Sequence, residues 1–352
     1  MKKNLRRMLM SLMVAGMAIL PVIGFGMTPG PEIEKVLNGI TIGAPVTYRN
    51  LTLYPLISRR GGIGEDYLTL DEAMERGVLT VEEKSGGSVP EVMVTNRSSR
   101  PVFIFAGEII AGAKQDRIVR TDTLLAPCGG RMSLSVYCVE QGRWHGKSDS
   151  FEASHYNAGA YLRKIAQTGA SQAMVWDGVT KKNRALGVAP STGTLRAVYT
   201  SSENRKVFDE YRATFSCFPD MAPATIGVVA CSGGEIVCGD IFGSPGLFRA
   251  EWKKLLTSYI ADGAASSRRG RVVERWRIES FLSRLRSPGS VVRERGVSLG
   301  QNIRLTWPGG VAAGLFYRGY TVHLSVFPDG EGGDCSAPGR VIGTTNRGDL
   351  SR

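Results

Sequence analysis

Charged and amide side chains gather at one point of the chain, directly after an apolar run at residues 102–105 that predicts a buried strand. A connecting loop needs glycine and polar residues, but it does not need charge at this density. Because a rigid strand end aims side chains at a fixed point, the pattern predicts a catalytic or binding site. The cluster comprises Gly107, Glu108, Gly112, Lys114, Gln115, Asp116 and Arg117.

A second dense run of polar and aromatic residues follows at positions 135–144 and contains Glu140, Arg143 and Trp144. We expect the two runs to form facing walls of one site. Within that site, Arg143 and Trp144 could stack on a planar ring or hold a phosphate group. An ordinary core position is an equally good interpretation of Trp144.

The basic residues of the first run indicate an anionic ligand. Lys114 and Arg117 are spaced to flank one anion, Arg117 as a bidentate fork and Lys114 as a point charge. Gln115 could hydrogen-bond a ribose or a base edge. Gly107 and Gly112 complete the predicted binding set, because a purely structural ion-pair network rarely needs glutamine and two glycines beside it.

Three carboxylates, Glu108, Asp116 and Glu140, are enough for a general base or for a magnesium site. The alternative is that they lock the strand end in an ion-pair network. Cys138 shares a strand face with Glu140, which disfavours the thiolate and makes a small buried thiol the better interpretation. Three histidines in total, none in a metal-ligand spacing, argue against zinc.

The first 26 residues resemble a secretory signal peptide. Lys2, Lys3, Arg6 and Arg7 precede an uncharged apolar segment at residues 8–25, which predicts export to the periplasm or the medium. An uncleaved membrane anchor and a true start at Met27 are the alternatives. No second apolar stretch is long enough to span a membrane.

Without residues 1–26 the net charge falls from +12 to about +8, which suits an anionic ligand. Basic residues concentrate only at positions 268–295, which we interpret as the solvated surface of an exposed helix rather than a nucleic-acid interface. Six cysteines leave Cys128–Cys138 and Cys231–Cys238 as close disulfide candidates, with isolated thiols equally expected.

Periodicity predicts an α+β protein with a strand-rich N-terminal half and a helical middle. A hairpin, an amphipathic helix and closing strands follow. Thr69 and Glu72 form a predicted capping box, whereas Asp240 and either Ser191 or Thr192 are expected to cap later helices. Residues 40–328 are predicted to form one composite domain with possible sub-halves at 40–150 and 151–328, followed by a disordered tail at 329–352. The predicted strands are 50–57, 78–82, 89–94, 101–105, 134–139, 226–230, 236–240, 303–307, 311–317 and 320–327, and the predicted helices are 158–172, 172–180, 202–215 and 245–260.

Residues 107–108, 112–117 and 136–144 resemble the signature of the ADP-ribosylglycohydrolase- and rhodanese-phosphatase-associated protein domain family. Later segments at 175–177, 239–242, 252–259 and 323–327 fit it as well, so that the resemblance covers roughly residues 40 to 328. The resemblance implies ADP-ribose or another NAD-derived ligand.

We therefore expect binding of a phosphorylated, nucleotide-like molecule. Hydrolysis or transfer would use Glu108 or Glu140 as the base. A non-enzymatic sensor and a structural envelope protein, in which the charged cluster is only an ion-pair network, are the alternatives.

Overall fold

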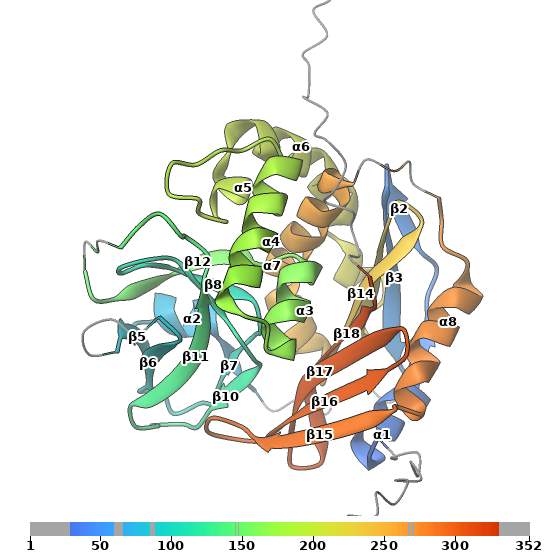
Figure 1. Ribbon diagram of the computed structural model, residues 1–352. Coiled ribbons are helices and arrows are strands. Elements are labelled where there is room, and N and C mark those ends of the chain that lie inside the picture. The colour runs from blue at the N-terminus through green and yellow to red at the C-terminus, as the bar shows by residue number, and fades with distance from the viewer. Residues whose placement is uncertain are drawn as a thin grey trace, which may run out of the picture.

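The computed structural model describes residues 29–59, 66–84, 89–144, 146, 148–266, 268 and 271–330 (Figure 1). The predicted signal peptide at residues 1–26, Cys335 and nearly all of the predicted tail lie outside these residues. The described chain mixes helices and strands as predicted and is an α+β protein.

A large antiparallel sheet unites the two ends of the described chain. Its order is β1-β3-β13-β14-β18-β17-β16-β15, with β2 paired to β3. The first three strands therefore share a sheet with the C-terminal strands. A boundary near residue 150, as in the possible sub-halves 40–150 and 151–328, would separate them. The strands are β1 (Ile40–Ile42), β2 (Val46–Tyr48), β3 (Leu51–Ser58), β13 (Thr225–Ser232), β14 (Glu235–Phe242), β15 (Ser290–Arg295), β16 (Gln301–Trp307), β17 (Gly310–Tyr317) and β18 (Tyr320–Pro328).

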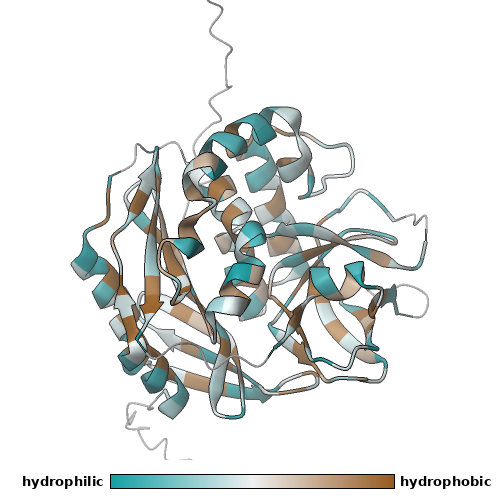
Figure 2. Cartoon of the chain, turned by 180° about the vertical axis from the view of Figure 1, so that it is seen from behind, coloured by the Kyte–Doolittle hydropathy of each residue, from teal (hydrophilic) through white to brown (hydrophobic). Residues whose placement is uncertain are grey.

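Helices cover both faces of this sheet (Figure 1). On one face lies α7 (Pro245–Ala265), which begins at Pro245 because the Ser244 side chain accepts from the Leu247 N–H. On the other face lie α1 (Pro31–Gly39), α8 (Arg275–Ser283) and the 3-10 helix η2 (Arg284–Arg286). Apolar residues gather between the layers, and the outer helix surfaces are largely hydrophilic (Figure 2).

Two smaller sheets form a second lobe beside the large one (Figure 1). Pairing is antiparallel as expected, except that β4 runs parallel to β7. The six-stranded sheet has the order β12-β8-β9-β11-β6-β5, and the three-stranded sheet has the order β10-β7-β4. The elements are β4 (Leu68–Thr69), α2 (Leu70–Glu75), β5 (Leu79–Glu83), β6 (Glu91–Asn96), β7 (Val102–Ile104), β8 (Glu108–Gly112), β9 (Arg117–Val119), β10 (Thr123–Leu125), β11 (Met132–Cys138) and β12 (Phe151–Asn157).

The predicted capping box at the start of α2 is confirmed: the Thr69 side chain accepts from the Glu72 N–H, and the Glu72 carboxylate accepts from the Thr69 N–H. Thr69→Ala is expected to lower the free energy of unfolding by about 1 kcal/mol, since the Glu72 N–H in the first turn loses its acceptor. Urea unfolding measures this change. Thr168→Ala, at the far end of a helix where no N-cap is lost, is the control, and an equal effect of both substitutions would contradict the capping role.

The helical middle joins the two lobes through one shared apolar core. That core includes Phe103 and Phe105 of the second lobe, Phe208 and Phe215 of the helices, and Phe242 of the large sheet. The helices are α3 (Ala160–Thr168), α4 (Gln172–Ala185), α5 (Ala197–Thr200), α6 (Ser202–Phe215) and the 3-10 helix η1 (Phe218–Asp220).

Three sequence predictions are wrong. The basic stretch at 268–295 is not one helix, because only α8 and η2 are helical and Ser290–Arg295 forms the edge strand β15. Asp240 caps no helix but lies buried inside β14, and Ser244 caps α7 instead. Ser191 and Thr192 precede no helix directly, since α5 begins at Ala197.

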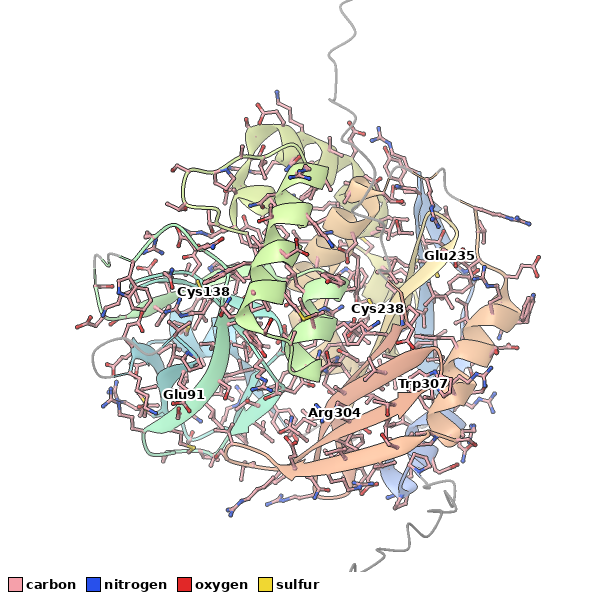
Figure 3. All side chains as sticks on the ribbon, in the orientation of Figure 1. Glu91, Cys138, Glu235, Cys238, Arg304 and Trp307 are labelled. Atoms are coloured by element: carbon pink, nitrogen blue, oxygen red, sulfur yellow. The ribbon has the colours of Figure 1, made fainter. Side chains whose placement is uncertain are left out.

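The cysteines of the described residues are free thiols. Neither candidate pair is bridged, and isolated thiols are the arrangement found. Cys138 lies in the second lobe, and Cys238 lies in the large sheet (Figure 3). Burial raises the pKa of Cys238, and Asp240 raises it further, so this thiol is a poor nucleophile.

Candidate functional site

The sheet of the second lobe brings the two polar runs together. Strands β8 and β9 pair across the turn at residues 113–116, and β9 pairs with β11 so that Arg117 lies opposite Cys138. The chain beyond β11 therefore passes directly beside this turn. Gln115 Nε2 donates to the backbone oxygen of Glu140 over 2.9 Å, as expected for adjoining walls.

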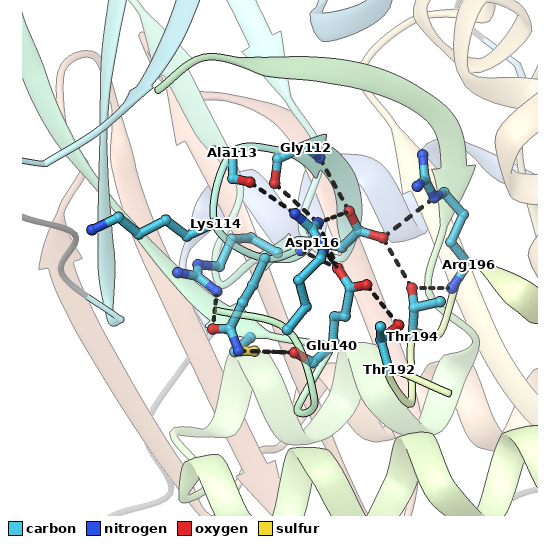
Figure 4. A network of polar contacts seen from close by, with 12 residues as sticks. Gly112, Ala113, Lys114, Asp116, Glu140, Thr192, Thr194 and Arg196 are labelled. Atoms are coloured by element: carbon cyan, nitrogen blue, oxygen red, sulfur yellow. Dashed lines mark hydrogen bonds and ion pairs between the residues drawn. The ribbon is translucent and has the colours of Figure 1, made fainter. Parts of the chain in front are cut away.

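Asp116 is the centre of the site and is fully buried (Figure 4). Its Oδ1 accepts from the Gly112 N–H at 3.1 Å and from Arg143 at 3.2 Å. Its Oδ2 accepts from Thr194 Oγ1 at 2.9 Å and lies 3.3 Å from Arg196 Nε. Both oxygens are thus used to hold the turn against the loop before α5.

Glu140 lies beside Asp116 and is held in the same way. Its Oε2 accepts from the Asp116 N–H at 3.0 Å and from Arg143 Nε at 2.8 Å, and its Oε1 accepts from Thr192 Oγ1 at 2.7 Å. Burial alone would raise the pKa of Glu140, but these hydrogen bonds outweigh it and lower the pKa. Glu140 is therefore a fixed anion rather than a base poised near neutral pH.

Arg143 ties the two walls to each other. Beyond its carboxylate partners, Nη1 donates to the Ala113 oxygen at 2.8 Å and Nη2 donates to the Gly112 oxygen at 3.2 Å. The hydrogen bond to Glu140 raises the pKa of Arg143, with further contributions from the Glu140 and Asp116 charges. Its side chain nevertheless keeps 24% of its surface exposed, so part of the cation faces solvent.

Arg117 and Gln115 lie deeper and do not reach the surface. Arg117 has no exposed area, and its Nη1 donates to Gln115 Oε1 over 2.7 Å. Its Nη2 lies 3.8 Å from a Glu83 carboxylate oxygen. Arg117 therefore does not flank an exposed anion together with Lys114 in this structure.

The solvent-facing part of the site combines an indole with cations. Trp144 is 43% exposed, and Lys114 Nζ lies 5.4 Å from the centroid of its ring. The Lys114 side chain points away from Asp116 and Glu140 (Figure 4). Arg196, on the opposite side of Asp116, has 41% of its side-chain surface exposed. An exposed aromatic plane with a cation beside it is an arrangement that binds planar anionic ligands.

Glu108 does not join this site. It lies at the start of β8, where its carboxyl group accepts a hydrogen bond from Lys254 of α7, which also contacts Glu251 at 3.0 Å and Asp71 at 3.3 Å. Burial raises the pKa of Glu108 to about 8, although Lys254 opposes the shift. Gly107 is beside it in a left-handed conformation with φ 89°, and a Cβ there would lie 2.5 Å from the Arg163 side chain. Gly107 therefore serves packing rather than the exposed site.

Sequence reasoning missed Thr192, Thr194 and Arg196 as members of the site. The sequence predicted only a helix cap at Ser191 or Thr192, and no local pattern connects residues 192–196 to Asp116. Lys254 and Glu251 were missed as well. The sequence pattern that could have revealed them is that they are three residues apart on a helix and alternate with the apolar residues Trp252 and Leu255. All four residues are buried.

Within the part of the chain that the structure describes, no group of three or more histidine, cysteine or carboxylate side chains is arranged to hold a metal ion. The magnesium site considered from the sequence would need Glu108, Asp116 and Glu140 together. Glu108 instead belongs to the Lys254 cluster, and Asp116 and Glu140 are bound by protein donors.

No helix among the described residues is both long and apolar enough to cross a bilayer. Comparison with curated proteins and with solved structures found no significant match. Comparison with family models did find one: residues 39–327 match the ARG and Rhodanese-Phosphatase-superfamily-associated Protein domain. Since this match spans most of the 352 residues, and since it contains the whole Asp116 site, the chain belongs to that family.

Proposed function

We propose that this protein binds a phosphorylated, nucleotide-like small molecule, with ADP-ribose or another NAD-derived compound as the expected ligand class. The binding surface is formed by Lys114, Arg143, Trp144 and Arg196. The observation that carries the proposal is the exposed Trp144 ring beside Lys114. A large aromatic side chain that is 43% exposed beside a cation suits a planar base next to a phosphate.

The geometry supports binding more strongly than turnover at this surface. The carboxylate oxygens of Asp116 and Glu140 accept hydrogen bonds from the backbone and from Arg143, Thr192 and Thr194. A general base must reach the substrate proton, and these carboxylate oxygens already accept hydrogen bonds from protein donors. They instead fix Arg143 and Arg196 in place, so that a ligand would meet preorganised cations.

Export remains our proposal for the location of the protein, because of the charge and apolar order of residues 1–26. The ligand must then be one that is present outside the cytoplasm. The proposal of an anionic ligand does not depend on this location.

Trp144→Ala tests the binding surface. Isothermal titration of the wild-type chain with ADP-ribose, NAD, AMP and inorganic phosphate should give saturable binding of at least one nucleotide. Loss of the indole should weaken that binding by about tenfold or more, because stacking of a base on an aromatic ring contributes about 1–3 kcal/mol. Mass spectrometry of the same mixtures measures whether the ligand is also hydrolysed.

Trp276→Ala is the matched control, because Trp276 is 62% exposed on α8, which covers the face of the large sheet opposite to α7. Its loss should leave the affinity unchanged. If no nucleotide binds, or if both tryptophan variants bind equally well, the proposal fails. The charged cluster would then be only an ion-pair network, and the contacts of the buried Asp116 would be its purpose.

A further inference from the structure

A second pocket lies where the two lobes meet, away from Trp144. It is bounded by the loop before β10, by the last turn of α3 and by strands β15 to β17 of the large sheet. The Asn302 side chain closes the seam by donating to the Asp122 backbone oxygen over 2.9 Å. The lining residues are Thr121, Asp122, Gln167, Val292, Glu294, Asn302, Ile303, Arg304, Ala313 and Gly314.

The pocket is small enough to restrict what it can hold. Its cavity volume is about 30 Å³, and a single buried water needs about 10–15 Å³. The enclosed part therefore accommodates about two water molecules or one carboxylate group. A nucleotide cannot enter it, which separates this pocket from the Trp144 surface.

Two hydrogen-bond donors at the pocket have no partner among the described residues. Gln167 is only 5% exposed, and its Nε2 donates to nothing. Arg304 is half-buried on β16 (Figure 3) and makes no hydrogen bond or ion pair within the described chain. A buried amide donor without a partner destabilises the folded state, so a group that accepts from Gln167 would be bound favourably.

The Asp122 carboxylate, which lines the buried part of the pocket, is already used as an acceptor. Asp122 Oδ1 accepts from the Ala106 N–H at 2.9 Å, and Asp122 Oδ2 lies 2.7 Å from His323 Nδ1. Glu294 remains, but it is exposed at the rim. The enclosed space thus offers donors and requires an acceptor, while the rim carboxylate disfavours a doubly charged anion.

We propose that this pocket binds the carboxylate group of a small organic acid. The planar carboxylate would take two N–H groups from the Arg304 guanidinium and one from Gln167. The bound group would connect the helical middle with the large sheet, through Gln167 of α3 and Arg304 of β16. The remainder of the acid would extend past Glu294 into solvent.

Thermal unfolding of the full chain with acetate, propionate, inorganic phosphate and chloride, at matched ionic strength, tests the proposal. Acetate or propionate should raise the melting temperature saturably, and chloride should not. Arg304→Gln should weaken carboxylate binding by about tenfold or more, because it removes a charged bidentate donor. Gln167→Leu should also weaken binding, by less than Arg304→Gln does, and it should fold because it removes a buried donor that lacks a partner.

Arg295→Gln removes the same charge from β15, but its side chain faces away from Val292 and Glu294 because strand residues alternate. It should bind carboxylates as the wild type does, and so should Trp144→Ala. The proposal is overturned if no carboxylate shifts the melting temperature. It is also overturned if Arg304→Gln and Gln167→Leu retain the shift, or if phosphate is preferred over both acids.

Discussion

Replacing Arg163 by methionine should lower the free energy of unfolding by about 3–5 kcal/mol, as for removal of one partner of a buried ion pair. Arg163 and Asp240 have no exposed side-chain area. The guanidinium donates to both Asp240 oxygens, at 2.8 and 2.9 Å. Methionine fills much of the space but leaves the carboxylate without its main counter-charge. Urea unfolding monitored by circular dichroism measures the change.

A surface pair provides the control for this substitution. Arg212 and Asp209 lie 2.6 Å apart, but their side chains are 32% and 69% exposed. Arg212→Met should therefore cost less than about 1 kcal/mol. The double variant Arg163→Met, Asp240→Leu should recover part of the loss, because no buried carboxylate is then left unpaired. Equal costs for Arg163→Met and Arg212→Met would contradict the role of the buried pair.

The Arg163–Asp240 pair belongs to a buried polar network that connects the large sheet, α7 and the second lobe, which carries the Asp116 site. Asp240 on β14 also accepts from Tyr259 of α7 and from Ser325 of β18. His323 then connects Asp240 to Asp122, which lies in the second lobe between β9 and β10. The strand that carries Arg117 and the sheet that carries Arg304 are thus held by one continuous buried chain of charges. Substitutions that break this network should disturb both the Asp116 site and the pocket where the two lobes meet.

Local patterns in the sequence were sufficient to predict many of the longer elements, but not strands β8, β9 and β12 beside the site. Helix α6 spans the predicted residues 202–215, and the capping box begins α2 where Thr69 and Glu72 predict it. The proximity of Asp116 and Glu140 was also predictable, because their strands are close in sequence. Strand β15 was missed because an exposed edge strand with four solvent-facing residues has no apolar alternation to reveal it.

The buried charges could not be predicted, because their partners are distant in sequence. Glu108 and Lys254 are separated by 146 positions, and Arg163 and Asp240 by 77. Charged residues are almost never fully buried unless they are paired. From a single sequence, each of these residues is therefore predicted to be solvated, because its partner is known only from the fold. The assignment of Glu108 to the exposed site was an expectation of this kind.

The buried ionisable groups make stability depend on pH. Burial alone would lower the pKa of His323, but Asp122 and Asp240 outweigh it and raise the pKa from 6.5 to about 9. The protonated ring thus contributes stability that is fully present below pH 6.5 and is lost as the pH rises through about 9. Glu108 acts in the same direction, since its pKa is raised from 4.5 to about 8 and the folded state keeps a proton that the unfolded chain releases.

The free energy of unfolding should therefore fall between pH 6.5 and pH 9 by on the order of 3 kcal/mol from His323 alone, at 1.36 kcal/mol for each unit of pKa shift. Urea unfolding at half-unit pH intervals measures the slope. His323→Gln keeps a neutral polar side chain between the same aspartates, and it should remove most of the slope above pH 6.5 while leaving the part that begins near pH 4.5 from Glu108. Stability that does not fall between pH 8 and pH 9, above the pKa of Glu108, would mean that His323 is neutral when folded. Asp240 would then depend on Arg163 as its counter-charge, and Arg163→Met should prove still more destabilising.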